Sequence, residues 1–450
     1  MVNLQRLLFS VLGSSALPGV LVDDSLKSDV IGGLYQPASW SPQAKIAVYV
    51  MHAEVNYASF SACTALAERG YTVLCANNAL DKTGFGAPLG FEEMMLMVGS
   101  GMRYLRSQPG IEKVVLFGHS GGGAMMADYQ NIAENGAGAC NGTEKIYYRC
   151  SSAMDGLLPA DGVMLIDANY GLSTMTLMSL NPALERSESG RLAVNPALDQ
   201  FNPANGFRNG SAAEYPASFT SSFFSGVYAL NEELIATAQD RLAAIEAGEA
   251  LFDDDEPFYI PDGTYIGPNN KLLGQDPRLL AHTEHVWPLL TPTGIVEQVV
   301  HSVRVPSSRS PIHSMAHSYI RGALKTTVRR YLSTFAIRAT PDYAITEDGI
   351  VGVDWFSSHM VPVAAVPGIS VPLLTMGMTG HYEYLNAEKI YLASGSNDTA
   401  IVFVEGAEHN LDTCTACEQY AGQYGDTAER AYGYIAEWLG KEGRFMHAGA

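Results

Sequence analysis

A glycine-rich stretch around Ser120 holds the residues best suited to catalysis. Residues 114–117 are apolar, residues 118–123 read Gly-His-Ser-Gly-Gly-Gly, and residues 124–132 favour a helix. In a G-x-S-x-G pattern between a strand and a helix, a sharp turn lifts the serine hydroxyl clear of the sheet, and the glycines prevent collisions. The Gly121 N–H, at the start of the helix, is then placed to hold a developing oxyanion. The pattern predicts that Ser120 is a nucleophile; the alternative is a glycine-rich turn that binds an anion without covalent chemistry.

A serine nucleophile needs a base, and His409 is the best-placed histidine. It follows residues 400–404, the last apolar strand that the sequence predicts. A late histidine completes the chain order nucleophile, acid, base that such strand-turn-helix sites use. Four other histidines could also lie near the strand ends, namely His52, His119, His359 and His381. We predict that His409 is the base; the alternative is a histidine on a surface loop.

Three segments together resemble the α/β-hydrolase superfamily. They are residues 118–122, residues 52–54 (His-Ala-Glu) after an apolar strand, and residues 406–409 (Gly-Ala-Glu-His). The resemblance covers residues 40–170 and 365–440. It implies the α/β-hydrolase fold, a serine-acid-histidine triad and no cofactor.

The resemblance also implies which groups form the oxyanion hole. The family uses the N–H after the nucleophile and one after the third strand, which here are those of Gly121 and Glu54. Ala53 stands where the family commonly has glycine, whose backbone adopts positive φ without strain. The loop at Ala53 is therefore the place where this chain departs from the family pattern.

The acid of the triad is open between several carboxylates. In the family it usually follows the strand that here is residues 371–376, but residues 377–380 (Gly-Met-Thr-Gly) contain no acid. Asp167 directly follows the apolar residues 163–166 and so lies at the carboxyl end of the sheet, where α/β sites form. Asp167 is our first prediction. The other candidates, in order of preference, are Glu388 and then Glu383 or Asp354.

The serine motif belongs to a series of apolar runs that alternate with helix-forming stretches. The predicted strands are residues 45–51, 71–76, 114–117, 163–166, 371–376 and 400–404, and the predicted helices are 59–69, 91–107, 123–135 and 427–439. This alternation predicts a mostly parallel sheet with helices on both faces. Residues 170–335 interrupt the series and are rich in Asn, Pro and Ser. We interpret them as an inserted cap on a core formed by residues 1–169 and 336–450.

The composition excludes several classes of partner. The chain has 450 residues with 27 Lys and Arg against 47 Asp and Glu, a formal charge of −20. Binding to nucleic acid or to an anionic membrane surface is therefore not expected. No apolar run reaches the ~18 residues of a membrane span. Residues 7–12 resemble a short signal peptide, but a single Arg precedes them, so we predict an uncleaved cytoplasmic chain, with secretion as the alternative.

The six cysteines do not form a metal-binding pattern. Cys63 and Cys75 lie in apolar stretches and are predicted to be buried thiols. The remaining four form two pairs that are either free thiols or loop disulfides, Cys140 with Cys150 and Cys414 with Cys417. The acidic residues 253–256 and the His-Thr-Glu-His of residues 282–285 also lack metal-ligand spacing. No metal is predicted.

Together these residues predict a serine hydrolase that cleaves a carboxylic ester or lactone through an acyl-enzyme on Ser120. The large apolar cap predicts a bulky, hydrophobic small-molecule substrate. The same scaffold could instead serve an acyltransferase, a C–C bond hydrolase or a cyclase of secondary metabolism. An alternative from another class is a binding protein for small molecules that has no catalytic activity.

Overall fold

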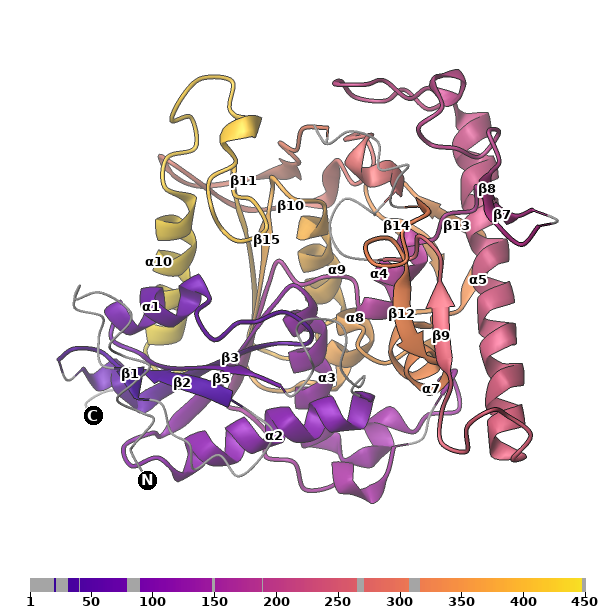
Figure 1. Ribbon diagram of the computed structural model, residues 1–450. Helices are drawn as coiled ribbons and strands as arrows, with labels where there is room; N and C mark the ends of the chain where they lie inside the picture. The colour runs from indigo at the N-terminus through magenta and orange to yellow at the C-terminus, as the bar shows by residue number, and fades with distance from the viewer. Residues whose placement is uncertain are drawn as a thin grey trace, which may run out of the picture.

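A sheet of ten strands forms the centre of the molecule. The computed structural model describes residues 20–21, 31–39, 41–78, 90–147, 150–187, 189–264, 271–306 and 316–446 (Figure 1). In sheet order the strands are β1 (Val20–Leu21), β2 (Ile31–Tyr35), β4 (Thr72–Asn77), β3 (Ile46–His52), β5 (Lys113–His119), β6 (Gly162–Ile166), β15 (Leu373–Met378), β16 (Thr399–Val404), β10 (His282–Thr291) and β11 (Gly294–His301). All strands from β4 to β10 in this order run parallel, whereas β1, β2 and β11 are antiparallel to their neighbours. The sheet is therefore mostly parallel, as the sequence predicts.

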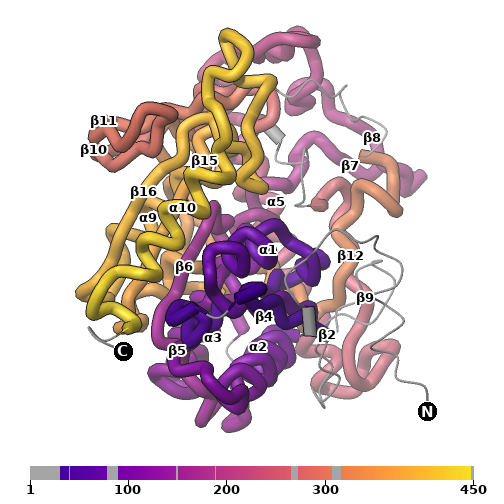
Figure 2. The backbone as a smooth tube through the Cα atoms, turned by 90° about the vertical axis from the view of Figure 1, so that its left-hand side faces the viewer, coloured from indigo at the N-terminus to yellow at the C-terminus, as the bar shows by residue number. Residues whose placement is uncertain are grey.

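Helices cover both faces of the sheet. Helices α2 (Phe91–Ser107), α3 (Gly121–Asn135) and α9 (Asn386–Ala393) lie on one face, and α1 (Ser61–Glu68) and α10 (Thr427–Gly440) lie on the other (Figures 1 and 2). Strand β3 serves both layers: Tyr49 and Met51 belong to the core under α2 and α3, while Val48 and Val50 belong to the core under α1 and α10. Successive side chains of a strand point to opposite faces, so a strand covered on both sides is apolar throughout.

The segment between β6 and β15 builds the cap and also extends the sheet. Its remaining elements are α4 (Leu172–Ser179), β7 (Leu184–Arg186), β8 (Leu192–Val194), α5 (Ala217–Glu246), β9 (Pro257–Ile260), β12 (Leu324–Thr327), α7 (Val328–Arg330), β13 (Ala339–Ile345), β14 (Ile350–Val353) and α8 (Pro362–Ala365). β10 pairs in parallel with β16, although it falls within the predicted cap, residues 170–335. β13 packs on α5, although it falls within the predicted core. The predicted boundaries differ from the structure because β10 mixes polar residues and a proline, and so lacks the apolar run of a buried strand.

The cap and the sheet share one hydrophobic core. Phe219 and Phe223 of α5 and Tyr331 after α7 belong to the same buried cluster as Tyr49 and Met51 of β3. The cap is therefore continuous with the main core on the face that α2 and α3 cover.

All six cysteines form disulfides, Cys63 with Cys75, Cys140 with Cys150 and Cys414 with Cys417. The prediction of buried thiols at Cys63 and Cys75 is therefore wrong. The two residues face each other because α1 packs on the side of β4 that carries Cys75. Of the two alternatives for the other pairs, the structure has the disulfides.

Among the helices in the described ranges, none combines the length and the apolar character needed to cross a membrane. Residues 7–12, which resemble a signal peptide, lie outside the described residues.

Candidate active site

Ser120 lies on the tight turn that joins β5 to α3. Its φ of 57° and ψ of −129° are a combination that residues other than glycine rarely adopt. A Cβ on Gly118 would lie 2.6 Å from the Cα of Gly123, and a Cβ on Gly122 would lie 2.5 Å from the Met51 carbonyl oxygen. Such a strained turn after a strand of a mostly parallel sheet has the geometry of a nucleophile elbow. The chain has the α/β-hydrolase fold.

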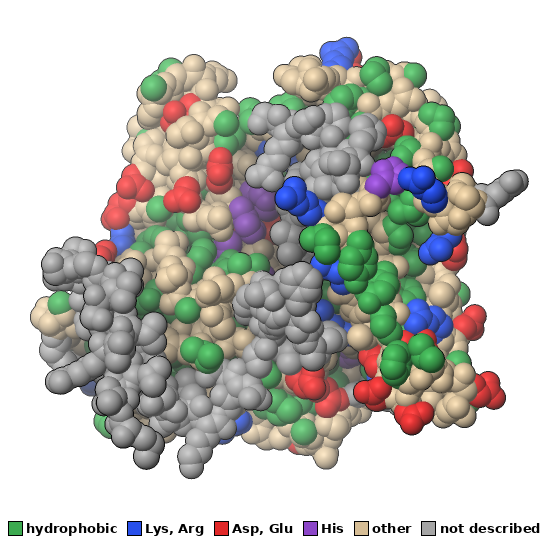
Figure 3. Space-filling model, viewed as in Figure 1, with side chains coloured by type: hydrophobic (Ala, Val, Ile, Leu, Met, Phe, Trp, Pro, Cys, Tyr) green, Lys and Arg blue, Asp and Glu red, His purple; other side chains and the backbone are tan. Residues whose placement is uncertain are grey.

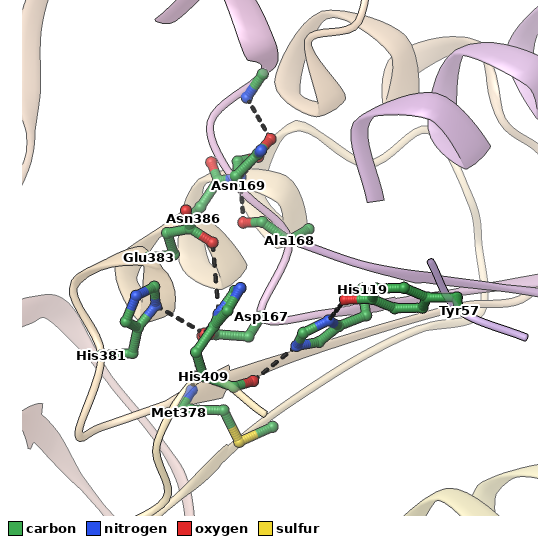
Figure 4. Close-up of polar contacts among 11 residues, drawn as sticks. Tyr57, His119, Asp167, Ala168, Asn169, Met378, His381, Glu383, Asn386 and His409 are labelled. Carbon is green, nitrogen blue, oxygen red and sulfur yellow. Dashed lines mark hydrogen bonds and ion pairs between the residues drawn. The ribbon is translucent and has the colours of Figure 1, made fainter. Parts of the chain in front are cut away.

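In this α/β-hydrolase fold, the predicted base and the first candidate acid lie side by side. Nδ1 of His409, on the loop after β16, is 2.7 Å from Oδ2 of Asp167, which follows β6 (Figure 4). Asp167 is buried, has a φ of 40°, and accepts the Met378 N–H on its other oxygen at 3.0 Å. Because a carboxylate can only accept, Nδ1 of His409 carries a proton and Nε2 keeps the lone pair that a base needs.

Burial and hydrogen bonding displace the pKa values of this pair from their ordinary range. Burial raises the pKa of the Asp167 carboxyl, but the hydrogen bonds and positive charges of His381 and His409 outweigh burial and hold the pKa well below its usual value. Burial lowers the pKa of His409, but the charge of Glu383 when that carboxyl is ionised, the hydrogen bond to Asp167 and the negative charge of Asp167 raise it above its ordinary value. Asp167 is thus ionised, and it stabilises an imidazolium at His409.

A second imidazole, that of His381, shares the Asp167 carboxylate. Its Nδ1 is 3.0 Å from the same oxygen, Oδ2, and its ring lies 4.1 Å from that of His409, centroid to centroid. Burial and the charge of His409 lower the pKa of His381 to about 4, although Asp167 opposes the shift. His381 is therefore neutral near pH 7. His381 follows β15, where the family usually has the acid. Its contact with Asp167 was not predicted from the sequence.

Glu383 is the second carboxylate near His409. Its Oε2 is 3.6 Å from Nδ1 of His409, beyond hydrogen-bond distance. Burial raises the pKa of Glu383 to about 8, with the charge of Asp167 adding to the shift and that of His409 opposing it. Glu383 is therefore mostly protonated near pH 7. Both its distance and its protonation make Asp167 the better partner for His409.

The other two candidate acids bind elsewhere. Glu388 accepts the backbone N–H groups of Glu284 and His285, both at 2.9 Å, and the Trp287 indole N–H at 2.7 Å. It thereby fastens β10 to α9 and does not contact His409. Asp354 forms an ion pair with Arg338 at 3.2 Å. Glu388 lies in the first turn of α9, and its partners come from the β10 hairpin, which the sequence did not reveal.

His119, the residue before Ser120, connects the turn after β5 to the loop of His409. Its Nε2 is 2.6 Å from the His409 carbonyl oxygen, and its Nδ1 is 2.5 Å from the Tyr57 hydroxyl (Figure 4). Burial and the charge of His409 lower the pKa of His119 to about 3, so the ring is neutral. Since a carbonyl oxygen can only accept, Nε2–H donates to His409 and Nδ1 accepts from Tyr57. Sequence reasoning missed this role, and its only signal was a histidine within the serine motif.

The two predicted oxyanion-hole donors differ in their surroundings. Gly121 opens α3, and the first N–H groups of a helix have no partner within it. The Glu54 N–H, in contrast, donates to Nδ1 of His52 at 2.9 Å, as does the Val55 N–H at 2.8 Å. The His52 ring thus lies over its own loop. The Glu54 N–H, which is the predicted second donor of the oxyanion hole, already donates to this ring. The Glu54 carboxylate forms an ion pair with Arg330 of α7.

One cavity joins these residues, and we call it the Ser120 cavity. It has a volume of about 210 Å³, and Ser120, His381, Glu383 and His409 line it together with the apolar side chains of Val55, Leu172 and Met175 and with His52, Glu54, Asn169 and Tyr382. Figure 3 shows histidine side chains gathered near the centre of the face that it displays. A second cavity of about 400 Å³ lies at the cap, where its lining includes Arg330, Phe91 and His359.

Four side chains of the site could also hold a metal ion. One donor atom from each of Asp167, His381, Glu383 and His409 lies within 4.8 Å of the others. Spacing in the sequence missed this group because its members follow different strands. Here Oδ2 of Asp167 is bonded to both imidazoles, at 2.7 and 3.0 Å. A metal ion would have to replace these two hydrogen bonds.

Comparison with known proteins gives matches among solved structures alone. No protein-family model and no curated protein matches the chain. A soluble variant of monoglyceride lipase from Saccharomyces cerevisiae has 10% identity and a TM-score of 0.40, over 97% of this chain and 98% of that one. The hydrolase GrgF from Penicillium has 11% identity and a TM-score of 0.39, over 91% and 93%. Est1E from Butyrivibrio proteoclasticus has 8% identity and a TM-score of 0.38, over 94% and 97%. Because these TM-scores are below 0.5, the fold is assigned from the strand arrangement and the elbow.

Proposed function

We propose that this protein is a serine hydrolase that cleaves a carboxylic ester or lactone through an acyl-enzyme on Ser120. One observation carries the proposal: the strained Ser120 shares a cavity with His409, whose Nδ1 is 2.7 Å from the buried carboxylate of Asp167. A nucleophile on an elbow, an imidazole and a carboxylate that orients it are the groups that acyl transfer to serine requires.

Each group has a defined part in the reaction. The Ser120 hydroxyl attacks the ester carbonyl carbon while Nε2 of His409 takes its proton, and the imidazolium then gives that proton to the departing alcohol. Water attacks the acyl-enzyme in the same way, with His409 again taking and returning a proton. Asp167 holds the tautomer of His409. The Gly121 N–H binds the oxyanion, and the Glu54 N–H joins it when its bond to His52 is released.

The dimensions of the Ser120 cavity bear on the substrate. Its volume of about 210 Å³ is below the ~300 Å³ at which most drug-sized ligand pockets begin. Its lining combines three apolar side chains with several polar ones. We therefore propose a compact ester. The sequence predicts a bulky, hydrophobic substrate from the large cap, and this stays a prediction. The cavity of about 400 Å³ near Arg330 could hold part of such a substrate.

A panel of para-nitrophenyl esters with acyl chains from acetate to decanoate tests this function. We expect turnover by the wild-type chain to be highest for the shorter acyl groups, and Ser120→Ala to lower kcat by about 10³-fold or more. Asn209→Ala, an exposed change in the cap, is the control and should match the wild type. Product analysis separates the alternatives: free acid indicates hydrolysis, an acylated acceptor indicates transfer, and neither product from a folded chain favours a binding protein.

We also propose that the chain folds in an oxidising compartment, contrary to the cytoplasmic location that the sequence favours. The support is that all six cysteines are paired. Alkylation of the denatured, unreduced protein should leave its mass unchanged. Six alkyl groups per chain would contradict the proposal.

A further inference from the structure

Three neighbouring strands of the sheet end at one group of metal-ligating side chains, which we call the two-histidine cluster. Asp167 follows β6 and His409 follows β16. His381 and Glu383 follow β15, which lies between those two strands in the sheet. One donor atom from each of the four side chains lies within 4.8 Å of the others. The ligand atoms therefore meet at the carboxyl end of the sheet, on loops that the central strands hold in place.

Glu383 brings an unused acceptor to the two-histidine cluster. Its side chain is buried, and only 3% of the residue is exposed. Its Oε2 lies 3.6 Å from Nδ1 of His409 and has no hydrogen-bond partner in the described part of the chain (Figure 4). The Tyr382 side chain also hydrogen-bonds to this carboxyl group and does not occupy Oε2. Native proteins rarely bury a polar atom without a partner unless an unseen water or ion satisfies it.

The distances within the cluster suit a small ion with four ligands. In a tetrahedral zinc site with bonds of about 2.0–2.2 Å, the ligand atoms lie about 3.4 Å from one another. Here Oδ2 of Asp167 is 2.7 Å from Nδ1 of His409 and 3.0 Å from Nδ1 of His381. Oε2 of Glu383 is 3.6 Å from Nδ1 of His409. These three distances bracket the tetrahedral value.

The chemistry of the four donors selects the ion. Zinc binds imidazole nitrogens and carboxylate oxygens, whereas magnesium and calcium prefer oxygen ligands alone. Two ionised carboxylates balance the charge of a divalent cation, and two imidazoles bind as neutral ligands. The formal charge of −20 on the chain also draws cations toward its surface.

An ion from solvent can reach the cluster through the Ser120 cavity. His381, Glu383 and His409 all line this cavity. The two imidazole side chains are partly exposed, 21% for His381 and 25% for His409, whereas the Asp167 side chain is fully buried. The cluster is therefore open to solvent on the side of the imidazoles and closed on the side of Asp167.

We propose that the two-histidine cluster binds one Zn²⁺ ion reversibly and that this ion switches the hydrolase off. Coordination by Nδ1 of His409 and Nδ1 of His381 replaces their hydrogen bonds to Asp167. The proton of each neutral imidazole moves from Nδ1 to Nε2, and the Glu383 carboxyl releases its proton to solvent. Nε2 of His409 then has no lone pair for the proton of Ser120. The effect on activity rests on the proposed function, whereas the zinc site itself does not.

Zinc titrations of para-nitrophenyl acetate hydrolysis test the switch. We expect zinc to inhibit the wild-type chain, EDTA to restore its activity, and magnesium at the same concentration to have no effect. Glu383→Gln and His381→Gln each remove one ligand. Each should raise the zinc concentration for half-inhibition at least about tenfold, measured against its own rate without zinc.

His301→Gln is the matched control for the loss of a histidine. His301 is exposed and lies beside His282, with 5.6 Å between the ring centroids, so this pair is another place where zinc could bind. The control should keep the inhibition of the wild type. If His301→Gln abolishes inhibition while Glu383→Gln and His381→Gln retain it, the proposed site is wrong.

Calorimetry with zinc chloride keeps the site separate from the proposed function, because binding needs no turnover. If the wild-type chain hydrolyses no ester, the hydrolase function fails, yet its Kd for zinc should still be at least about tenfold lower than those of Glu383→Gln and His381→Gln. Equal Kd values would overturn the site. An active chain whose turnover is unchanged when zinc saturates the cluster would overturn the switch.

A crystal of the wild-type chain soaked in zinc chloride covers the case in which a variant misfolds. Anomalous density should appear ~2.0–2.2 Å from one donor atom of each of Asp167, His381, Glu383 and His409. Density at other histidines alone would overturn the zinc site.

Discussion

Replacing Asp167 by asparagine tests the contact that orients His409, with almost no change in volume. The carboxylate accepts three hydrogen bonds, from Nδ1 of His409 at 2.7 Å, Nδ1 of His381 at 3.0 Å and Met378 N–H at 3.0 Å. An asparagine has one oxygen. If that oxygen keeps the Met378 N–H, the amide NH₂ faces both imidazoles, and His409 must hold its proton on Nε2.

The size of the loss in kcat follows from the two orientations that the asparagine amide can take. In the first, the amide oxygen accepts the Met378 N–H, and Nε2 of His409 cannot take a proton from Ser120. In the second, the amide oxygen faces the imidazoles and the NH₂ opposes the Met378 N–H; a buried donor left without an acceptor costs about 1–3 kcal/mol. The first orientation should dominate. We expect kcat to fall by up to ~10⁴, about 5 kcal/mol of transition-state stabilisation, with little change in KM.

The assay is steady-state hydrolysis of para-nitrophenyl acetate by Asp167→Asn and, as the matched control, Glu383→Gln. The control replaces a carboxyl that is mostly protonated near pH 7, so it should keep kcat within about tenfold of the wild type. The reasoning is refuted if Asp167→Asn stays nearly as active as the wild type while Glu383→Gln loses most of its activity. Glu383 would then be the acid.

Three further predictions concern Glu383, the oxyanion loop and the cap. Glu383→Gln should gain thermal stability over the wild type as pH rises from 4.5 to 8, because folding raises the pKa of Glu383 from 4.5 to about 8 and the unfolded chain releases its proton first; a constant difference in melting temperature would contradict this. Arg330→Gln should lower kcat about tenfold, because it removes the ion pair that fixes Glu54; an unchanged kcat would show that the ion pair does not support the oxyanion loop. Deleting residues 170–335 should abolish cooperative unfolding, since it removes β10 and β11 and opens the shared core, and a sharp calorimetric transition would refute this.

The parts of the site that local sequence patterns encode could be predicted. Ser120 is recognisable because the elbow needs glycines between a strand and a helix. Asp167 is recognisable because an acid directly after a fully apolar strand lies at the rim of the sheet, and the structure brings it to His409. Glu388 was a candidate acid that does not contact His409. Its role could not be seen in the sequence because its partners lie about a hundred residues away in the chain, on β10.

The parts that depend on long-range packing could not be predicted. β10 carries a proline and polar residues, so its place in the sheet becomes visible only through its pairing with β16. The Cys63–Cys75 disulfide depends on α1 lying over β4, which no spacing encodes. The bond from the Glu54 N–H to His52 depends on how the imidazole folds back, and a sequence motif does not specify a side-chain rotamer.

Labelling with a fluorophosphonate and mapping of the modified peptide test the central claim, an activated nucleophile at Ser120, most directly. We predict one adduct per chain, on Ser120, with none on Ser120→Ala and labelling at least about a hundredfold slower on His409→Gln, because a serine without its base is a poor nucleophile. An adduct on another residue, or no adduct on a chain that circular dichroism shows to be folded, would contradict the account.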